Sequence, residues 1–325
     1  MKKLIAQILV LSLILVTCTV GLAKSKKPVV GIAWTPNTES IFFKNPCRAL
    51  EAAGVRYVFL GQIFSTDLKY DANGKLLDGV DVTGALTESA GKLIRCNSWQ
   101  NSNAAEELKN ITAVIFTGGE DISPSLYYRQ EKWHGIEEER DYNAERDVSD
   151  YLLMSYCLEN DIPLLGLCRG MQMLSVVSGA EAIQDIPTYF EERQLVYNFE
   201  HRRPEQPRDF ASNNVRVVKN SLLYDITKKN ILRGVPCWHH QAIENVNDTR
   251  LKISGYAPTD GINMIEAVER TDKTFALGLQ FHPEAALVKN LDNTADMANF
   301  LDYDTALEFF KRLANAKAVS ARKAA

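Results

Sequence analysis

The sequence predicts an α/β protein with a central, mostly parallel sheet. Three hydrophobic runs, residues 29–34, 56–60 and 113–116, are nearly continuous and do not alternate with polar residues. Strands of this kind are buried on both faces, as in parallel sheets that helices cover on either side. An apparent helix that ends before Gly54 separates the first two runs, so the predicted fold begins with a β-α-β unit.

Between the second strand and the third, residues 61–103 form short polar segments with turn signals at residues 71–75 and 78–79. We interpret this stretch as an inserted excursion that contains hairpin turns. Its role is open: it is a surface decoration, a flap over a site or a dimer contact. Decoration is slightly favoured, because nothing in the segment is chemically distinctive.

The remaining elements follow from the same patterns. We expect helices at residues 104–110, 142–160 and 295–313, a strand that begins at residue 163, and strands at 215–218, 251–256, 264–269 and 275–281. Residues 270–274 suit a hairpin between the last two strands, and residues 127–140 and 199–210 are polar enough for loops. Neither an internal repeat nor an interdomain linker interrupts the pattern, so residues 24–325 are expected to form one domain.

Composition excludes some classes of partner. The 325 residues are 46% hydrophobic and 24% charged, which is ordinary for a globular protein. The formal net charge is -4 and the sequence pI is about 5.8, so no global positive field favours nucleic acid or an anionic membrane surface. We therefore expect neither as a partner of the folded domain.

The N-terminus resembles a secretory signal peptide. Two lysines precede a mostly apolar run at residues 4–16, which is short for a transmembrane helix, and Gly21 and Ala23 suit cleavage after Ala23. We expect residues 1–23 to be removed and the protein to be exported, either to a periplasm or to the medium. Lipid attachment at Cys18 is the less favoured alternative, because Thr17 stands where bacterial lipoproteins carry a small Gly or Ala.

Five cysteines follow the predicted leader, an odd number in a compartment expected to be oxidising, so at least one thiol stays unpaired within a monomer. They are Cys47, Cys96, Cys157, Cys168 and Cys237. None lies in a C-x-x-C pair, and no His/Cys group has the spacing of metal ligands along the chain. The sequence therefore predicts no metal and no cofactor.

The chemistry centres on residues 166–172, where an apolar strand breaks at Gly166, presents Cys168 and continues as an apparent helix. This G-x-C-x-G arrangement is typical of a nucleophile elbow, in which Gly166 and Gly170 let the strand and the helix pack closely. The helix N-terminus favours a thiolate, and the backbone N–H of Arg169 can hold an oxyanion. The alternative is a buried structural cysteine in a strand-to-helix connection.

Two further segments fall at strand ends. Gly118 and Gly119 follow the strand at residues 113–116, where a glycine N–H could be a second oxyanion donor; a plain tight turn is the alternative. His282 follows the last predicted strand, with Glu284 two residues on, beyond a turn that Pro283 would stiffen. Of the five histidines, only His282 has an adjacent carboxylate at a strand terminus, so it is the candidate base.

Five motifs in order resemble the class I glutamine amidotransferase-like hydrolases, specifically the γ-glutamyl-γ-aminobutyrate hydrolase branch, peptidase family C26. They lie at residues 118–127, 166–172, 239–242, 260–269 and 278–284, and the resemblance covers roughly residues 28–313. It implies a flavodoxin-like three-layer sandwich and cleavage of a γ-glutamyl amide through a thioester. In that mechanism Cys168 attacks, His282 shuttles the proton and Glu284 orients His282.

The resemblance also implies an oxyanion hole formed by Arg169 and by Gly119, with Gly118 as a near rival. It places Gln172 against the γ-glutamyl moiety and makes His239, His240 and Gln241 substrate-binding or supporting residues. The family usually carries Asn-Ser shortly before the paired histidines, where this chain has Pro236 and Cys237. The expected partner is a small γ-glutamyl substrate. A glutaminase subunit of an amidotransferase, a non-catalytic γ-glutamyl-binding protein and a homodimer stay open.

Overall fold

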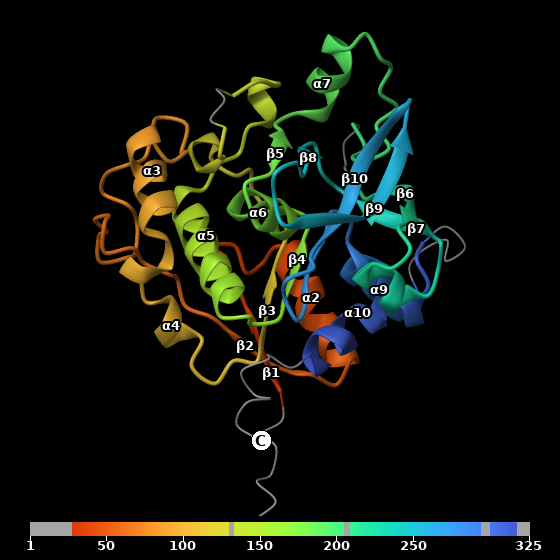
Figure 1. Cartoon of the computed structure of the whole chain (residues 1–325), viewed down its shortest axis with the longest axis horizontal. Helices are drawn as coiled ribbons and strands as arrows, with labels where there is room; N and C mark the ends of the chain where they lie inside the picture. The colour runs from red at the N-terminus through yellow and green to blue at the C-terminus, as the bar shows by residue number, and fades with distance from the viewer. Residues whose placement is uncertain (1–27, 130–132, 205–208, 294–299, 317–325) are drawn as a thin grey trace, which may run out of the picture.

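A nine-stranded sheet runs through the protein in this computed structural model, which describes residues 28–129, 133–204, 209–293 and 300–316 (Figure 1). Five strands in the order β2-β1-β3-β4-β11 are parallel to their neighbours, which is the strand order of flavodoxin-like sheets. Their bounds are Val29–Ile32 (β1), Arg56–Phe59 (β2), Ala113–Phe116 (β3), Leu164–Leu167 (β4) and Ala276–Leu279 (β11).

Beyond β11 the sheet continues with four antiparallel strands in the order β10-β9-β6-β7. Their bounds are Ala211–Val217 (β6), Ile231–Cys237 (β7), Leu251–Thr259 (β9) and Ile262–Arg270 (β10), and a separate two-stranded sheet pairs Glu181–Ile183 (β5) with Ala242–Asn245 (β8). The predicted hairpin at residues 270–274 joins β10 to β11 as expected. The sheet is therefore parallel in its first half and antiparallel in its second.

Helices cover both faces of the sheet, which confirms the predicted three-layer architecture. The alternating side chains of β3 show the layers: Val114 and Phe116 belong to one apolar cluster, whereas Ala113 and Ile115 belong to the other. The first cluster packs against Glu88–Asn97 (α3), Ala104–Glu107 (α4), Ala144–Glu159 (α5) and Arg169–Val177 (α6). The second packs against Ile41–Ala52 (α2), Leu222–Thr227 (α8), Pro283–Asp292 (α9) and Tyr303–Asn315 (α10), and Ile186–Glu192 (α7) lies apart from both.

Residues 61–103 lie beside α5 at one flank of the molecule (Figure 1). Two narrow turns are closed by isolated bridges, Tyr70 with Leu76 and Val80 with Leu86, and the segment then forms α3 and a 3-10 turn, Ser98–Asn101 (η1). Two further 3-10 turns lie later in the chain, at Pro124–Leu126 (η2) and Glu137–Glu139 (η3). The excursion thus carries a helix that the turn signals did not predict.

Several element bounds differ from those expected. The helix predicted at residues 104–110 is a single turn, and no helix had been predicted at α9, where Pro283 occupies the first turn that proline favours. The final described helix begins only at Tyr303, while residues 294–299 and the predicted leader at residues 1–23 lie outside the described residues. No helix among the described residues is both long and apolar enough to cross a bilayer.

Candidate active site

Cys168 lies at a sharp junction between β4 and α6, as the G-x-C-x-G pattern predicts. Its backbone has φ 50° and ψ -106°, a conformation that residues with a Cβ rarely adopt. A Cβ on Gly166 would overlap the backbone of Gly170, and a Cβ on Gly170 would overlap the backbone of Phe116. Glycine at both positions is therefore required for the close packing of α6 on the strands, which holds Cys168 in this strained geometry.

The Cys168 sulfur faces polar groups from two distant strand ends. Its Sγ lies 3.7 Å from the Trp238 carbonyl oxygen, just after β7, and 3.6 Å from Nε2 of Gln280, just after β11. Cys168 is 5% exposed, so it is shielded yet accessible from the cavity that it lines. Gln280 belongs to the motif at residues 278–284, but the sequence reasoning assigned it no role.

His282 is fully buried, and its Nδ1 lies 2.5 Å from Oε1 of Glu284. Glu284 is in the first turn of α9, so the helix start, and not the turn predicted from Pro283, brings the carboxylate back to the ring. Burial lowers the pKa of His282, but its interactions with Glu284 and Cys168 outweigh burial and raise that pKa to about 10. The imidazole is therefore held in its protonated form at neutral pH, beside the cysteine.

The Gly118–Gly119 loop is anchored by Arg146 of α5. The Arg146 guanidinium donates to the Gly118 carbonyl at 2.8 Å and to Thr117 Oγ1 at 2.9 Å, and it pairs with the Glu120 carboxylate. Gly119 has φ +152°, and a Cβ there would overlap the same guanidinium. A Cβ on Gly118 would instead lie 3.0 Å from Cε1 of His282, so both glycines border the reactive centre.

The side chain of Arg169 packs against α5 and does not line the cavity. The guanidinium is fully buried and pairs with Asp150 and, at 2.6 Å, with Asp147, both on α5. Burial raises the pKa of Asp147 to about 6, although Arg169 and Ser123 both oppose that rise. As the first residue of α6, Arg169 presents its N–H outside the helical hydrogen-bond ladder, near Cys168.

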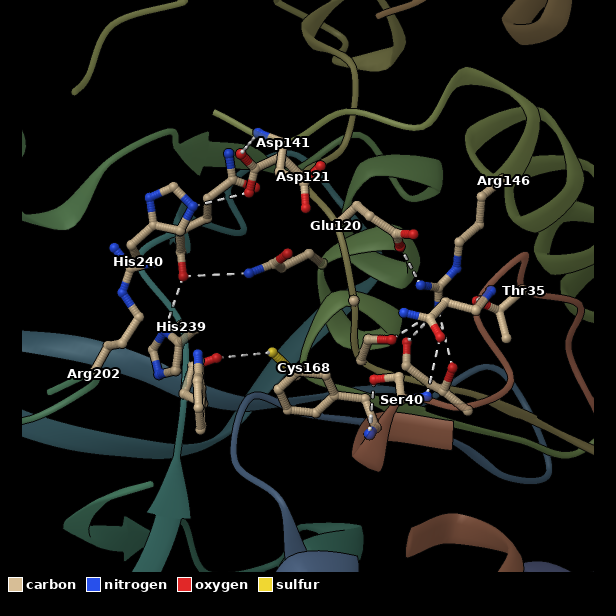
Figure 2. A pocket seen from close by; sticks show the side chains of 18 of the residues that line it. Thr35, Ser40, Glu120, Asp121, Asp141, Arg146, Cys168, Arg202, His239 and His240 are labelled. Atoms are coloured by element: carbon tan, nitrogen blue, oxygen red, sulfur yellow. Dashed lines mark hydrogen bonds and ion pairs between the residues drawn. The ribbon is translucent and has the colours of Figure 1, made fainter. Parts of the chain in front are cut away.

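A cavity of about 580 Å³ opens above Cys168 (Figure 2). The predicted residues that line it are Gly118, Gly119, Cys168, Gln172, His239, His240 and Gln241. Charged side chains that the sequence did not assign to the site also line it: Glu120, Asp121, Glu138, Glu139, Asp141, Arg140, Arg146 and Arg202. No residue of the 61–103 excursion lines this cavity, which argues against a flap role in the described conformation.

His240 is held between two carboxylates at the rim of the cavity. Its Nε2 lies 2.9 Å from Oδ1 of Asp121, and its Nδ1 lies 3.1 Å from Oδ1 of Asp185. Burial lowers the pKa of His240, but the two carboxylates raise it by more than burial lowers it, so the net shift of this pKa is upward. Because both ring nitrogens are engaged, His240 contributes to the site by holding Asp121, which also lines the cavity.

The carbonyl of Gln241, in the segment that follows β7, is contacted by Gln172 of α6 and by His239 of the same segment. Gln172 Nε2 donates to the Gln241 carbonyl at 3.3 Å, and His239 Nδ1 contacts the same carbonyl at 2.9 Å. The Gln172 hydrogen bond joins the elbow helix to a chain segment 69 residues away, and the His239 contact stabilises that segment internally. The structure thus gathers Gln172, His239 and Gln241 at one wall of the cavity.

The five cysteines of the described chain are all free thiols: Cys47, Cys96, Cys157, Cys168 and Cys237. Of these, only Cys168 is among the cavity-lining residues. A buried structural cysteine would lie among core residues away from the cavity. The position of Cys168 at the cavity distinguishes it from such a cysteine.

Comparison with known proteins gives consistent matches. The family model described as peptidase C26 matches residues 76–284. Protein NtpR of Enterococcus hirae is 32% identical over 198 residues, which is 61% of this chain and 75% of the relative. The glutamine amidotransferase-like protein RP404 of Rickettsia prowazekii is 29% identical over 57% of this chain and 75% of its own length. The γ-glutamyl-γ-aminobutyrate hydrolase of Escherichia coli O157:H7 is 34% identical over 45% of this chain and 56% of the relative.

Proposed function

The chain belongs to the peptidase C26 family, and from this membership and the geometry of the site we propose that it is a cysteine hydrolase that cleaves γ-glutamyl amide bonds; its leader-like N-terminus is the basis for proposing that it is exported. The observation that carries the proposal is the convergence of three groups at one point. A strained cysteine at a helix start lies beside a protonated histidine, and a carboxylate is bonded to the far nitrogen of that histidine.

In the proposed first step, the Cys168 thiolate attacks the γ-carbonyl carbon of the substrate. The carbon–nitrogen bond breaks, and His282 gives its proton to the leaving amine, so a γ-glutamyl thioester forms on Cys168. Glu284 holds the His282 ring in place and stabilises its positive charge through the 2.5 Å contact. The charges that raise the pKa of His282 thus prepare it as the acid for this step.

In the second step, water attacks the thioester carbonyl while His282 takes the proton of that water. The carbon–sulfur bond then breaks, which restores the thiolate and the protonated His282 and releases glutamate as its γ-carboxylic acid, which loses its proton to solvent. Both steps pass through an oxyanion, which we assign to the backbone N–H groups of Arg169 and Gly119, with Gly118 as the rival donor. The positive φ of Gly119 and its contact with Arg146 support a loop that is rigid before substrate arrives.

The proposed substrate class suits the charge of the cavity. A γ-glutamyl group carries an α-ammonium and an α-carboxylate, so its site needs charges of both signs. Glu120, Asp121 and Asp141 line the cavity on one side of Cys168, while Arg202 lies on another (Figure 2). A volume of about 580 Å³ is within the range of sites for small molecules.

Export is proposed from the leader-like residues 1–23. An exported enzyme would meet γ-glutamyl compounds of the envelope or the medium. These include γ-glutamyl peptides, polyglutamates and peptidoglycan fragments that contain γ-linked glutamate. A panel of L- and D-γ-glutamyl substrates with different leaving amines would identify the one that is cleaved.

The decisive variant is Cys168→Ala. We expect it to abolish amine release from the γ-glutamyl panel and to block labelling by a glutamine-like electrophile. Cys96→Ala, at an exposed free thiol, should retain both activities. Unchanged amine release by Cys168→Ala would refute the assignment. Stoichiometric binding without cleavage by the wild type would favour a binding protein, and ammonia release from glutamine only with a copurifying synthase would favour a glutaminase subunit.

A further inference from the structure

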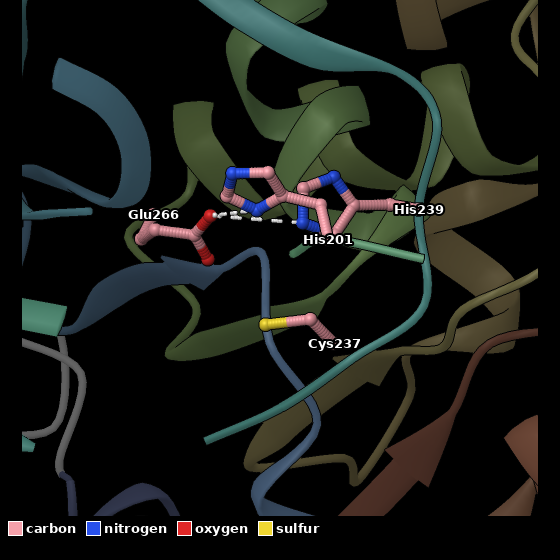
Figure 3. Close-up of side chains that lie close together, drawn as sticks. All are labelled: His201, Cys237, His239 and Glu266. Atoms are coloured by element: carbon pink, nitrogen blue, oxygen red, sulfur yellow. Dashed lines mark ion pairs between the residues drawn. The ribbon is translucent and has the colours of Figure 1, made fainter. Parts of the chain in front are cut away.

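Four buried side chains from separate parts of the chain converge beside the active-site wall (Figure 3). His201 precedes β6, Cys237 ends β7, His239 follows it by two residues, and Glu266 lies within β10. One imidazole nitrogen from each histidine, the Cys237 sulfur and a Glu266 oxygen all lie within 4.8 Å of one another. None of these four groups takes part in the two proposed chemical steps, although His239 also lines the main cavity.

The Glu266 carboxylate is the anomaly of this cluster. It is 0% exposed, and neither of its oxygens accepts a well-formed hydrogen bond from a described residue. Oε1 lies 3.0 Å from Nδ1 of His201 and 3.6 Å from Nε2 of His239. A buried carboxylate without donors is costly unless a cation compensates for it, so either a protonated imidazole or a metal ion must do so.

The second nitrogen of each imidazole shows how the rings are oriented. His239 Nδ1 lies 2.9 Å from the Gln241 carbonyl oxygen, which can only accept, so Nδ1 carries the proton. His201 Nε2 lies 3.0 Å from Thr259 Oγ1, and the Asn213 amide nitrogen lies 3.4 Å from His201 Nδ1 as a donor. In the neutral tautomer that the Gln241 carbonyl selects, His239 Nε2 directs a lone pair at Glu266, whereas the Thr259 hydroxyl can donate or accept and so allows either tautomer of His201. Anchoring of the far ring nitrogen in this way is typical of histidines that bind metal.

We propose that His201, Cys237, His239 and Glu266 bind one zinc-class divalent transition-metal ion. Two imidazoles, a thiolate and a carboxylate are ligands that Zn²⁺ accepts in tetrahedral geometry. Bond lengths of about 2.0–2.3 Å place tetrahedral ligand atoms roughly 3.3–3.8 Å apart. The observed spacing, within 4.8 Å, therefore needs only small side-chain shifts. With four protein ligands the site is closed, so the ion has a structural role.

The consequence for the active site follows from the position of Trp238. It lies between the ligands Cys237 and His239, and its carbonyl oxygen is 3.7 Å from the Cys168 sulfur. An ion bound by both Cys237 and His239, the two residues that flank Trp238, would fix the Trp238 carbonyl against the Cys168 sulfur. His239 also lines the main cavity and a second cavity of about 170 Å³, which provides an entry path for the ion.

The first test uses the purified full chain. We expect elemental analysis to find about one zinc per chain, and we expect chelation followed by Co²⁺ addition to yield the absorption of a tetrahedral site with a thiolate-to-cobalt charge-transfer band. The band should persist in Cys168→Ala, which excludes the catalytic thiol as its source. Lack of bound metal together with lack of this band in the wild type would overturn the proposal and leave a protonated histidine as the counter-ion of Glu266.

The second test compares two ligand variants with a matched control. Cys237→Ser and Glu266→Gln should each weaken Zn²⁺ binding at least tenfold in competition with a chromophoric chelator. Cys157→Ser, which alters an equally buried thiol in α5 outside the cluster, should bind as the wild type does. Equal affinities in the wild type and both ligand variants would refute the site. If a ligand variant does not fold, the cobalt spectra of the wild type and Cys168→Ala decide.

Discussion

At the scale of single residues, His282 shows how charge can outweigh burial. A fully buried histidine ordinarily loses its proton, because a charged group is poorly solvated in the interior. Here Glu284 contacts one ring nitrogen at 2.5 Å, and the neighbouring Cys168 adds to its effect, so the pKa rises to about 10. The ring is therefore protonated at neutral pH, as the proposed mechanism requires of its acid.

Replacing Glu284 by Gln should lower the pKa of His282, because it removes the carboxylate charge that raises that pKa. The imidazolium is the proposed acid, so the alkaline limb of the kcat/KM profile should move to lower pH. Direct titration of the His282 Cε1–H by NMR would check the same shift. Glu192→Gln removes the carboxylate that lies 2.6 Å from the exposed His134 and should leave the limb in place. An unmoved limb in Glu284→Gln would contradict this role.

The same pKa shift predicts a pH dependence of stability. The pKa of His282 rises from 6.5 to about 10 on folding, so between these values the folded state binds a proton that the unfolded state releases. The stabilising contribution of this group is complete below pH 6.5 and is lost as the pH rises through 10. Urea titrations across this window should show a steeper loss of the free energy of unfolding in the wild type than in Glu284→Gln.

Gly119→Ala should impair catalysis more than stability. A side chain at this position conflicts with φ +152° and with the Arg146 guanidinium, so the loop must move. Displacement of a catalytic donor by about 1 Å can lower kcat/KM by about 10²-fold. Gly54→Ala is the matched control: it also has a positive φ, but open space surrounds it. It should destabilise the protein by about 1 kcal/mol with kcat/KM preserved. Equal kcat/KM values in the two variants would exclude Gly119 as an oxyanion donor.

At the scale of elements, buried ion pairs join α5 to the site. Arg146 holds the glycine loop, while Asp147 and Asp150 pair with Arg169 at the start of the elbow helix. One face of α5 thus fixes both segments that we propose as oxyanion donors. The helix itself was predicted from its apolar pattern, but the pattern did not indicate this role for its charges.

Arg169→Met should be strongly destabilising, because it leaves Asp147 and Asp150 buried without their main partner. Loss of one side of a buried pair typically costs about 3–5 kcal/mol, which denaturant unfolding would measure. Arg48→Met breaks a surface pair with Asp292 that spans 2.5 Å and should change the free energy of unfolding very little. Similar effects of the two variants would show that burial of the Arg169 pairs is unimportant for stability.

At the scale of the whole molecule, we expect the leader to direct export. Expression of the full chain in a bacterial host should yield a mature protein that begins after Ala23, as N-terminal sequencing of the envelope and medium fractions would show. A Lys2→Glu, Lys3→Glu variant removes the positive charges before the apolar run and should slow processing. Recovery of the intact N-terminus from the cytoplasm of wild-type cells would contradict export, and lipid on Cys18 would favour the alternative anchor.

Much of the fold was predictable because its signals are local. Hydrophobic runs located β1, β2, β3 and β4, and the G-x-C-x-G pattern located the strained elbow at Cys168. The strands β5, β7 and β8 and the helices α3, α7, α8 and α9 were missed. Proline is common in the first turn of a helix but also in turns, and Pro236 weakens the strand pattern of β7.

The sequence by itself located the parallel strands β1 to β4, the candidate nucleophile and the histidine with its nearby carboxylate, since each of these signals depends on residues a few positions apart. Only the tertiary structure decided what surrounds them: Arg146 on the glycine loop, Asp121 and Asp185 on His240, and the buried cluster around Glu266. Spacing along the chain predicted no metal site, because His201, Cys237 and Glu266 are far apart in sequence. Folding of the antiparallel half of the sheet brings them together, and burial then makes their charges interdependent.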